Sequence, residues 1–363
     1  MRILDNYILK AFIGPFLFGI FAFTSIFVGT GTLFRIAQYI TEYGASLWSV
    51  SRAFILALPS IVVLTFPMAV LLASLLTFGR LSGTSEIIVM RASGLSFLRL
   101  AMPVYVAAFF ISIGAVAFNE YVVPAANHAY QNIIRNEITK QAVPQAQEHI
   151  VLKTMEGDNI SALMYAKKFD SKTKELSGIT AQLFTNGNVT QMEYANTATW
   201  NGSYWIMHDG VVYDLSPDGN GVERNMHFKE QVLPIAKDPK QISSEQRNPE
   251  EMTIKELRQQ IQAYKASYVS TTKLEMEMYQ RFTIPIASFV FALVGAPLGL
   301  QKQRSSSSIG FGLSVVIIFV YYGVMTFTGA LGKGGALLPL VAACIPDFLG
   351  IVAGLYLNWR VSK

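Results

Sequence analysis

Long apolar runs alternate with polar segments along this chain. A helix needs about 20 consecutive apolar residues to cross the hydrocarbon core of a bilayer. Stretches of this kind occur three times before and three times after a long polar region. The pattern therefore predicts six membrane-spanning helices, at about 11–33, 54–78, 100–123, 282–300, 309–329 and 337–356.

The polar region between the third and fourth stretches has a different pattern. Its short runs are rich in β-branched and aromatic residues, and turn-forming pairs such as Asn201-Gly202 and Asp209-Gly210 separate several of them. Short, regularly spaced strands with such turns favour a sandwich or roll. We therefore expect an inserted all-β domain with strands at 149–154, 160–167, 178–184, 198–200, 204–208 and 211–215.

The return to the fourth apolar stretch begins with a helix-start signal. Thr253 and Glu256 have the spacing of a capping box, and Met252 and Leu257 stand at the positions of a hydrophobic staple. An apolar stripe follows and predicts a helix over about 253–268. The expected organisation is helices in 1–124, the β domain with this connecting helix in 125–270, and helices in 271–363.

The polar segment between the second and third stretches, residues 79–94, reads GRLSGTSEIIVMRASG. Thr84 or Ser85 can cap a short helix there, with Glu86 in its first turn, where the helix dipole favours an anion. The apolar residues 87–90 would point all round its axis, because successive helical residues are about 100° apart. Such a helix is predicted to be buried on several sides, by its own chain or by a partner. An ordinary loop between membrane helices is the alternative.

Composition supports a membrane protein. Of the 363 residues, 52% are hydrophobic and 15% are charged. The single cysteine, Cys344, excludes a disulfide framework and a cysteine metal site.

Basic residues orient the predicted helices, because short cytoplasmic loops carry an excess of lysine and arginine. One side receives nine such residues and the other receives three in its short loops. The nine are Arg2, Lys10, Arg80, Arg91, Arg99, Lys302, Arg304, Arg360 and Lys363, and the three are Arg35, Arg52 and Lys333. Both termini and the 79–94 segment should be cytoplasmic, and the β domain should lie outside. The net charge of +5 is then no argument for a nucleic-acid partner.

The sequence contains no recognisable catalytic or metal-binding motif. Its four histidines have no metal-ligand spacing, and neither G-x-S-x-G nor H-E-x-x-H occurs. Residues 329–334, GALGKG, lack the spacing of a nucleotide-binding P-loop. We therefore expect no catalytic residue, no metal and no cofactor in this chain.

Two arginines border the route from the membrane to the β domain. Arg35 ends the first apolar stretch on the outer side, and Arg135 precedes the β domain. Arginine binds phosphate through a planar fork of donors, which suggests an anionic amphiphilic cargo. Snorkelling to lipid headgroups is the alternative for each residue.

An ordered series of residues in the second stretch and the 79–94 segment resembles the signature of the lipopolysaccharide-export permeases, the LptF/LptG (YjgP/YjgQ) family. The series is Leu58-Pro59, Phe66-Pro67-Met68-Ala69, Leu71-Leu72, Leu75, Gly79, Leu81, Ser85-Glu86, Val89-Met90, Ala92 and Ser93-Gly94. The N-terminal Asp5-x-Tyr7-Ile8, the region from Pro285 to Arg304, and the arrangement of three plus three helices around an outer β domain are also similar.

The resemblance implies an inner-membrane subunit of an ABC transporter that extracts lipopolysaccharide and passes it through a periplasmic β-jellyroll to a bridge of similar jellyrolls. It implies a second permease of the family and two copies of a cytoplasmic ATPase, which binds ATP and Mg. The first and fifth stretches would form the cavity wall. The family's coupling helix falls on about 82–92, with candidate coupling residues Ser85, Glu86, Ile87, Met90, Arg91 and Gly94, and with Glu86 facing the ATPase. Arg35 and Arg135 are the candidate contacts to lipid phosphate.

Two other functions stay open at the level of sequence. One is an ABC membrane protein that couples ATP hydrolysis to an outer domain without moving lipid. The other is a membrane-anchored envelope enzyme, against which the missing catalytic motif counts. The sequence also leaves open whether the chain is of the LptF or the LptG type, and whether it pairs with itself.

Overall fold

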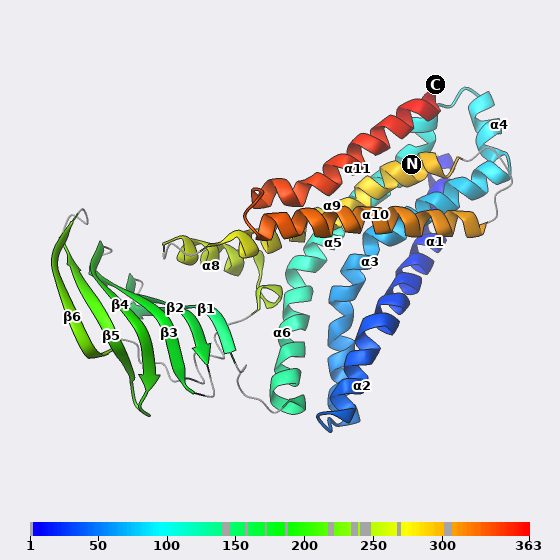
Figure 1. Cartoon of the computed structure of the whole chain (residues 1–363). Helices are drawn as coiled ribbons and strands as arrows, with labels where there is room; N and C mark the ends of the chain where they lie inside the picture. The colour runs from blue at the N-terminus through cyan, green and yellow to red at the C-terminus, as the bar shows by residue number, and fades with distance from the viewer. Residues whose placement is uncertain are drawn as a thin grey trace. The chain divides into compact units, whose positions relative to one another are not determined.

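The computed structural model describes residues 3–139, 146–156, 159–170, 173–185, 188–216, 221–233, 239, 248–266, 270–300 and 307–363. Arg2, Lys302 and Arg304, on which the predicted orientation partly rests, and residues 267–268 of the predicted helix lie outside these ranges. The chain divides into two compact units (Figure 1). The helical unit comprises Met1–Thr139, Pro249–Ile261 and Ser270–Lys363, and the β unit comprises Lys140–Asn248 and Gln262–Val269.

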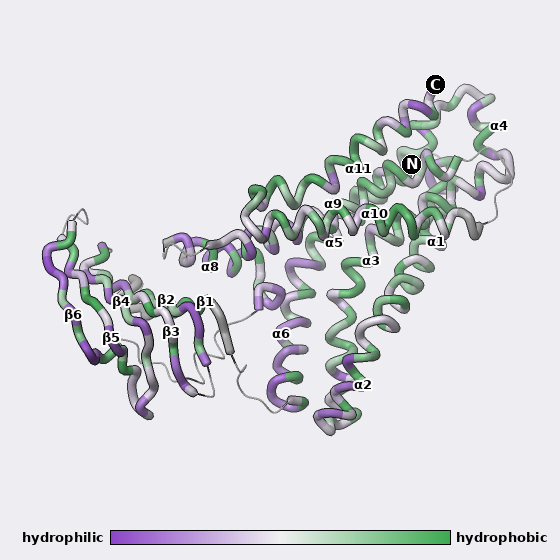
Figure 2. Tube along the Cα trace, in the orientation of Figure 1, coloured by the Kyte–Doolittle hydropathy of each residue, from purple (hydrophilic) through white to green (hydrophobic). Residues whose placement is uncertain are grey.

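Long apolar helices make up the helical unit, as the green colour of Figure 2 shows. Among the described residues, six helices are long and apolar enough to cross a membrane, which confirms the three-plus-three prediction. The elements of the first half are α1 (Ile3–Phe27), the π-helical turn η1 (Val28–Thr32), α2 (Leu33–Thr41), α3 (Leu47–Gly83), α4 (Glu86–Ala92), α5 (Phe97–Tyr121), α6 (Val123–Ile133) and the π-helical turn η2 (Ile134–Ile138). Those of the second half are η3 (Pro249–Glu251), α8 (Ile254–Ala266), α9 (Thr272–Leu298), α10 (Ser307–Lys333) and α11 (Pro339–Ser362).

The first three spans are longer than a bilayer requires. They contain 39, 37 and 42 residues, whereas the last three contain 27, 24 and 24. Their extra turns pack together at the end from which the chain leaves for the β unit, where Val50 and Ala53 of α3 share a cluster with Ile133 and Ile138. The helical unit therefore continues to Thr139, beyond the domain boundary expected near residue 125.

Helices α3 and α9 pack closely at the centre of the helical unit. Leu71 of α3 and Phe291 of α9 are both buried in one cluster. Gly295 permits this approach, because a Cβ atom there would lie 2.9 Å from Ser74 Cβ and 3.1 Å from the Leu71 carbonyl oxygen. Small residues at helix contacts have this role in membrane proteins.

Six antiparallel strands form the β unit, which confirms the inserted all-β domain. They are β1 (Ala146–Glu156), β2 (Asn159–Asp170), β3 (Glu175–Thr185), β4 (Asn188–Trp200), β5 (Trp205–Leu215) and β6 (Val222–Val232), paired in sequence order within one sheet. Ile150, Ile179, Ala195 and Trp205 are buried in a common core. Gln231 Nε2 of β6 donates a hydrogen bond to Glu193 Oε1 of β4 at 2.8 Å, across the intervening β5. The Gln231 and Glu193 side chains therefore lie on the same face of the sheet.

Two strand predictions were wrong. Strand β5 continues through Asp209-Gly210, which had been predicted as a turn between two strands. Asp209 has a φ of 49°, so a single residue adopts the left-handed conformation inside the strand. Gly210 lacks the Cβ atom that would collide with the ring of Phe228 and the carbonyl oxygen of Tyr194. Strand β6 was missed, because its mostly exposed side chains show no alternation of apolar and polar residues.

The capping box at the start of α8 is confirmed. The Thr253 backbone N–H donates to Glu256 Oε2 at 2.8 Å, and the Glu256 N–H donates to Thr253 Oγ1 at 3.3 Å. Met252 and Leu257, at the predicted staple positions, are both buried. The helix that follows reaches Ala266, close to the predicted end.

Candidate functional site

The short helix α4 follows a sharp turn at the end of α3. Helix α3 continues through Gly83, so residues 82 and 83 of the expected coupling helix belong to α3. Ser85 has a φ of 61° and makes no side-chain cap, whereas Thr84 Oγ1 donates to Glu86 Oε1 at 2.8 Å. Gly94, with a φ of 88°, follows the helix end as predicted. Figure 1 shows α4 at the same end of the helical unit as both termini.

One side of α4 packs against its own chain. Ile87 is 4% exposed and shares a core cluster with Leu81 of α3 and Phe97 of α5, and Met90 packs against this cluster. Ile88 and Val89 are 64% and 65% exposed. The prediction of burial on several sides is therefore met on one side only. The other side offers two apolar side chains within the described structure.

The Glu86 carboxylate attaches α4 to α1. Tyr7 Oη donates to Glu86 Oε2 at 2.7 Å, so both carboxylate oxygens accept a hydrogen bond from the same chain. The bond from Tyr7, followed by the bond from Thr84, lowers the pKa of Glu86 below its usual value. The carboxylate is thus ionised at neutral pH, and these contacts are lost only as the pH falls through the lowered pKa. A second contact, from Arg99 Nη1 to Asp5 Oδ1 at 2.7 Å, joins the start of α5 to α1.

The candidate coupling residues divide into two groups. Glu86, Ile87 and Met90 contact the rest of the helical unit, whereas Ser85, Arg91 and Gly94 are exposed. The sequence did not identify Tyr7 as the hydrogen-bond partner of Glu86. It also did not identify Ile88 and Val89 as the exposed apolar pair of α4. The run of four apolar residues was the one signal for that pair.

The two predicted phosphate-binding arginines lie in different environments. Arg35 is an exposed residue of α2, and no ion pair or hydrogen bond involves its side chain within the described part of the chain. Arg135 of η2 donates from Nη2 to Glu251 Oε1 at 3.0 Å, and the Glu251 side chain is almost fully buried. Arg35 is therefore available to an anion, whereas Arg135 already neutralises a buried carboxylate.

Two membrane helices leave their apolar sides uncovered. In the most apolar part of each span, 17% of the residues of the α1 span and 6% of those of α10 are buried, against 28% to 72% in the other four. Phe18 and Phe21 of α1 and Phe319 and Phe327 of α10 are among the exposed side chains. Large exposed apolar surfaces mark contacts to a partner or to lipid.

No group of three or more histidine, cysteine, aspartate or glutamate side chains that could hold a metal ion occurs among the described residues. The candidate site is the exposed surface of α4. The same unit also contains the exposed Arg35 and the uncovered apolar sides of α1 and α10.

Comparisons with known proteins match nearly the whole chain. The family model "Lipopolysaccharide export system permease LptF/LptG" matches residues 6–360. The lipopolysaccharide export system permease protein LptG of Escherichia coli K12 is 23% identical over 384 residues, which cover 99% of this chain and 99% of that protein. The protein of the same name from Haemophilus influenzae is 20% identical over 371 residues, which cover 99% of this chain and 98% of the relative.

Proposed function

Because the chain belongs to the LptF/LptG family of lipopolysaccharide export permeases, we propose that it is one permease subunit of an ABC transporter in the inner membrane. The transporter extracts lipopolysaccharide from the membrane and passes it through the periplasmic β unit towards the outer membrane. Both termini and α4 lie in the cytoplasm, and bridge proteins with similar β domains receive the lipid. Because the Escherichia coli and Haemophilus influenzae relatives described above carry the name LptG, we propose an LptG-type subunit that pairs with a second permease of the family.

Extraction of lipid from the membrane requires a source of energy that this chain does not contain. Removing acyl chains from a bilayer costs about 0.8 kcal/mol per buried CH₂ group, and the sequence has no P-loop spacing that could bind ATP. A separate cytoplasmic ATPase dimer, which binds ATP and Mg, is the partner that supplies it. Extraction by such a complex fits the family better than ATP-driven signalling without lipid movement or an envelope enzyme.

The exposed apolar pair of α4 is the observation that carries the assignment of the coupling site. Ile88 and Val89 lie outside the six candidate spans and point away from the core that buries Ile87. Exposed apolar side chains on a short helix suit insertion into a groove of a partner protein. Exposed Arg91 adds a charged contact at the rim of this surface.

Co-purification in mild detergent tests this assignment. The full chain should bring with it an ATP-hydrolysing protein, a second permease of the same family and lipopolysaccharide. Recovery of the chain without any ATPase, from cells that contain all candidate partners, would contradict the proposal.

Glu86→Lys is expected to reduce ATPase coupling several-fold while membrane insertion stays intact. Lysine removes the acceptor for Tyr7 and Thr84, so α4 loses its attachment to α1. Tyr7→Phe deletes the hydroxyl that donates to Glu86. Like Glu86→Lys, it should lower the amount of lipid transported per ATP hydrolysed. Tyr121→Phe is the control, because Tyr121 is 78% exposed at the other end of α5. Wild-type coupling in both Glu86→Lys and Tyr7→Phe would reject the role of this contact.

Arg35→Gln is expected to weaken retention of lipopolysaccharide in the purified complex about tenfold, because a charge-assisted contact to phosphate is lost. Arg52→Gln is the matched control, since Arg52 is already paired with Glu137 at 3.1 Å. The measurement is the amount of lipid bound per complex, with phosphorylated and dephosphorylated lipid. An equal loss of phosphorylated and dephosphorylated lipid would mean that Arg35 does not bind the phosphate group.

A further inference from the structure

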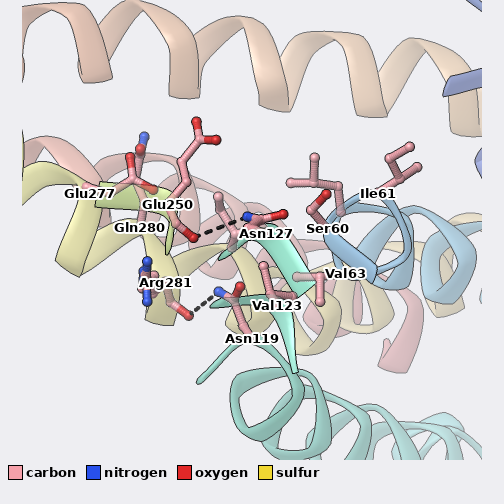
Figure 3. Close-up of a pocket in the computed structure, with 12 residues that line it drawn as sticks. Ser60, Ile61, Val63, Asn119, Val123, Asn127, Glu250, Glu277, Gln280 and Arg281 are labelled. Carbon is pink, nitrogen blue, oxygen red and sulfur yellow. Dashed lines mark hydrogen bonds between the residues drawn. The ribbon is translucent and has the colours of Figure 1, made fainter. Parts of the chain in front are cut away.

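A cavity of about 350 Å³ lies within the helical unit, bordered by α3, α5, α6, η3 and α9 (Figure 3). Asn119, Val123 and Asn127 border it at intervals of four residues. Glu277 and Gln280 of α9 border it at an interval of three. Residues with these spacings share one face of a helix, and the volume suits a small organic group. The described lining contains no residue of α1 or α10, so the cavity is separate from the uncovered sides of those helices.

The hydrogen-bond donors in the cavity wall already bind carbonyl groups of the chain. Ser60 Oγ donates to a carbonyl oxygen of its own helix at 2.9 Å. Asn119 Nδ2 donates to the Arg281 carbonyl oxygen at 3.2 Å, and Asn127 Nδ2 donates to the Glu250 carbonyl oxygen at 3.1 Å. Figure 3 shows both amide contacts as dashed lines. The wall therefore has few donors to offer a ligand.

Arg281 is the one basic residue in the described lining, and its charge is also engaged. It donates from Nη2 to the Pro249 carbonyl oxygen at 2.7 Å and from Nη1 to the Met252 carbonyl oxygen. Its Nη1 lies 4.0 Å from Glu120 Oε2, and its side chain is 7% exposed. An anionic ligand would have to replace these contacts, so the arginine does not make the cavity an anion site.

Two carboxylates of the lining have no such partners. Glu250 and Glu277 are close enough for their charges to interact, and neither side chain makes a hydrogen bond or ion pair within the described part of the chain. The cations near Glu277 are Arg281 and the exposed Lys333. With Glu120, three carboxylates thus stand against these two cations. A partly buried carboxylate without a partner is costly, so the cavity favours a cation with hydrogen-bond donors.

The depth of the cavity indicates where such a cation comes from. Helix α9 has 27 residues and is about 40 Å long, which exceeds the hydrocarbon core of about 30 Å. Its end turns therefore reach the level of the lipid headgroups, and Glu277 lies in its second turn. The opposite side of the cavity includes the apolar Ile61, so a carbon chain next to the charge would also find a surface (Figure 3).

We propose that the cavity binds a primary ammonium group between Glu250 and Glu277. A primary ammonium has three N–H donors for the carboxylates, and the described lining has no aromatic ring of the kind that binds quaternary ammonium. The group is carried by a lipid headgroup or by a small soluble amine. This ligand site goes beyond the proposed export function and does not depend on it.

Native mass spectrometry of the full-length chain in detergent tests the site with two lipids of the same acyl chains. Phosphatidylethanolamine has a primary ammonium, whereas phosphatidylcholine has a quaternary one without N–H groups. The parent chain should bind phosphatidylethanolamine about tenfold more tightly, the size expected for a charge-assisted contact. In Glu277→Gln, which keeps the side-chain shape, the two lipids should bind within about twofold of each other.

A second arm adds ethanolamine alone to the lipid-free chain. A rise in unfolding temperature in the parent chain, absent in Glu277→Gln, would assign the site to a soluble amine, and a preference between the lipids without this rise would assign it to the headgroup. Equal binding of the two lipids together with no effect of ethanolamine would overturn the inference.

Glu275→Gln is the matched control, because Glu275 is on the same helix, accepts a hydrogen bond from Thr271 at 2.9 Å and is not in the described lining. It should keep the full preference. Ser60→Phe fills the cavity without changing its charge, serves if Glu277→Gln fails to fold, and should also abolish the preference. An unchanged preference in both Glu277→Gln and Ser60→Phe, or an equal loss in Glu275→Gln, would contradict the site. None of these measurements involves an ATPase or lipopolysaccharide, so their failure would leave the proposed function standing.

Discussion

Replacing Ile88 and Val89 together by aspartate is expected to release the ATPase that we propose as the partner of α4. The two side chains are the exposed apolar residues of α4, and docking would bury both. Each buried aliphatic side chain contributes about 1.5–3 kcal/mol, so the pair accounts for about 3 kcal/mol or more, or about a hundredfold in affinity. Two buried, unpaired carboxylates would weaken the contact further.

Co-purification of the ATPase with the detergent-solubilised double variant measures this loss. Membrane insertion should be normal, because neither side chain belongs to a core cluster or to one of the six candidate spans. The conservative pair Ile88→Val with Val89→Ile keeps the apolar surface and should retain the ATPase. Full retention by the aspartate pair would show that docking occurs elsewhere.

Trp205→Ala is expected to unfold the β unit at physiological temperature. Trp205 is completely buried and packs against Phe169 and Trp200, with ring centroids 6.0 and 5.4 Å apart. Truncating a buried aromatic residue costs about 3–5 kcal/mol, which is comparable with the whole stability of a small domain. The neighbouring Tyr204 is 44% exposed, so Tyr204→Ala is the matched control.

Hydrogen exchange of the full-length protein measures the amide protection of each unit separately in these two variants. In Trp205→Ala, amides of β3, β4 and β5 should exchange much faster, while those of α3 and α9 keep their protection. Tyr204→Ala should change neither set. Full protection of the strands in Trp205→Ala would show that the core around Trp205 does not stabilise the sheet.

The membrane helices could be predicted because a long apolar run is a local signal. All six stretches are helices, yet the first three continue well beyond their apolar parts. Their additional turns are held by particular pairs, such as Tyr39 Oη and Tyr130 Oη at 3.2 Å, which lie 91 residues apart in sequence. A hydropathy pattern carries no information about such pairs, so it does not show that the helical unit extends to Thr139.

The all-β class of the inserted unit could be predicted from sequence, but the bounds of β5 and the existence of β6 could not. The Asp209-Gly210 pair is a common turn signal, but here the glycine makes room for a ring of the next strand. An edge strand such as β6 needs no apolar face, so its sequence does not distinguish it from a loop.

The sequence predicted a short helix near residues 82–92 but not which of its side chains contact the rest of the chain. The resemblance placed α4, and the structure adds which side of it is covered. Tyr7 and Glu86 are 79 residues apart, and Arg135 and Glu251 are 116 residues apart. Both contacts change the interpretation of a predicted residue: Glu86 accepts a hydrogen bond from its own α1, and Arg135 is paired with a buried carboxylate.

Photo-crosslinking to lipopolysaccharide with and without ATP hydrolysis tests the export function most directly. The full complex carries a photo-crosslinking residue at position 226 of the β unit, in vesicles that contain lipopolysaccharide. A lipid adduct is expected at this position with ATP, and none with a non-hydrolysable analogue. An adduct of equal yield under both conditions, or no adduct with ATP while the ATPase turns over, would contradict ATP-driven lipid export through this chain.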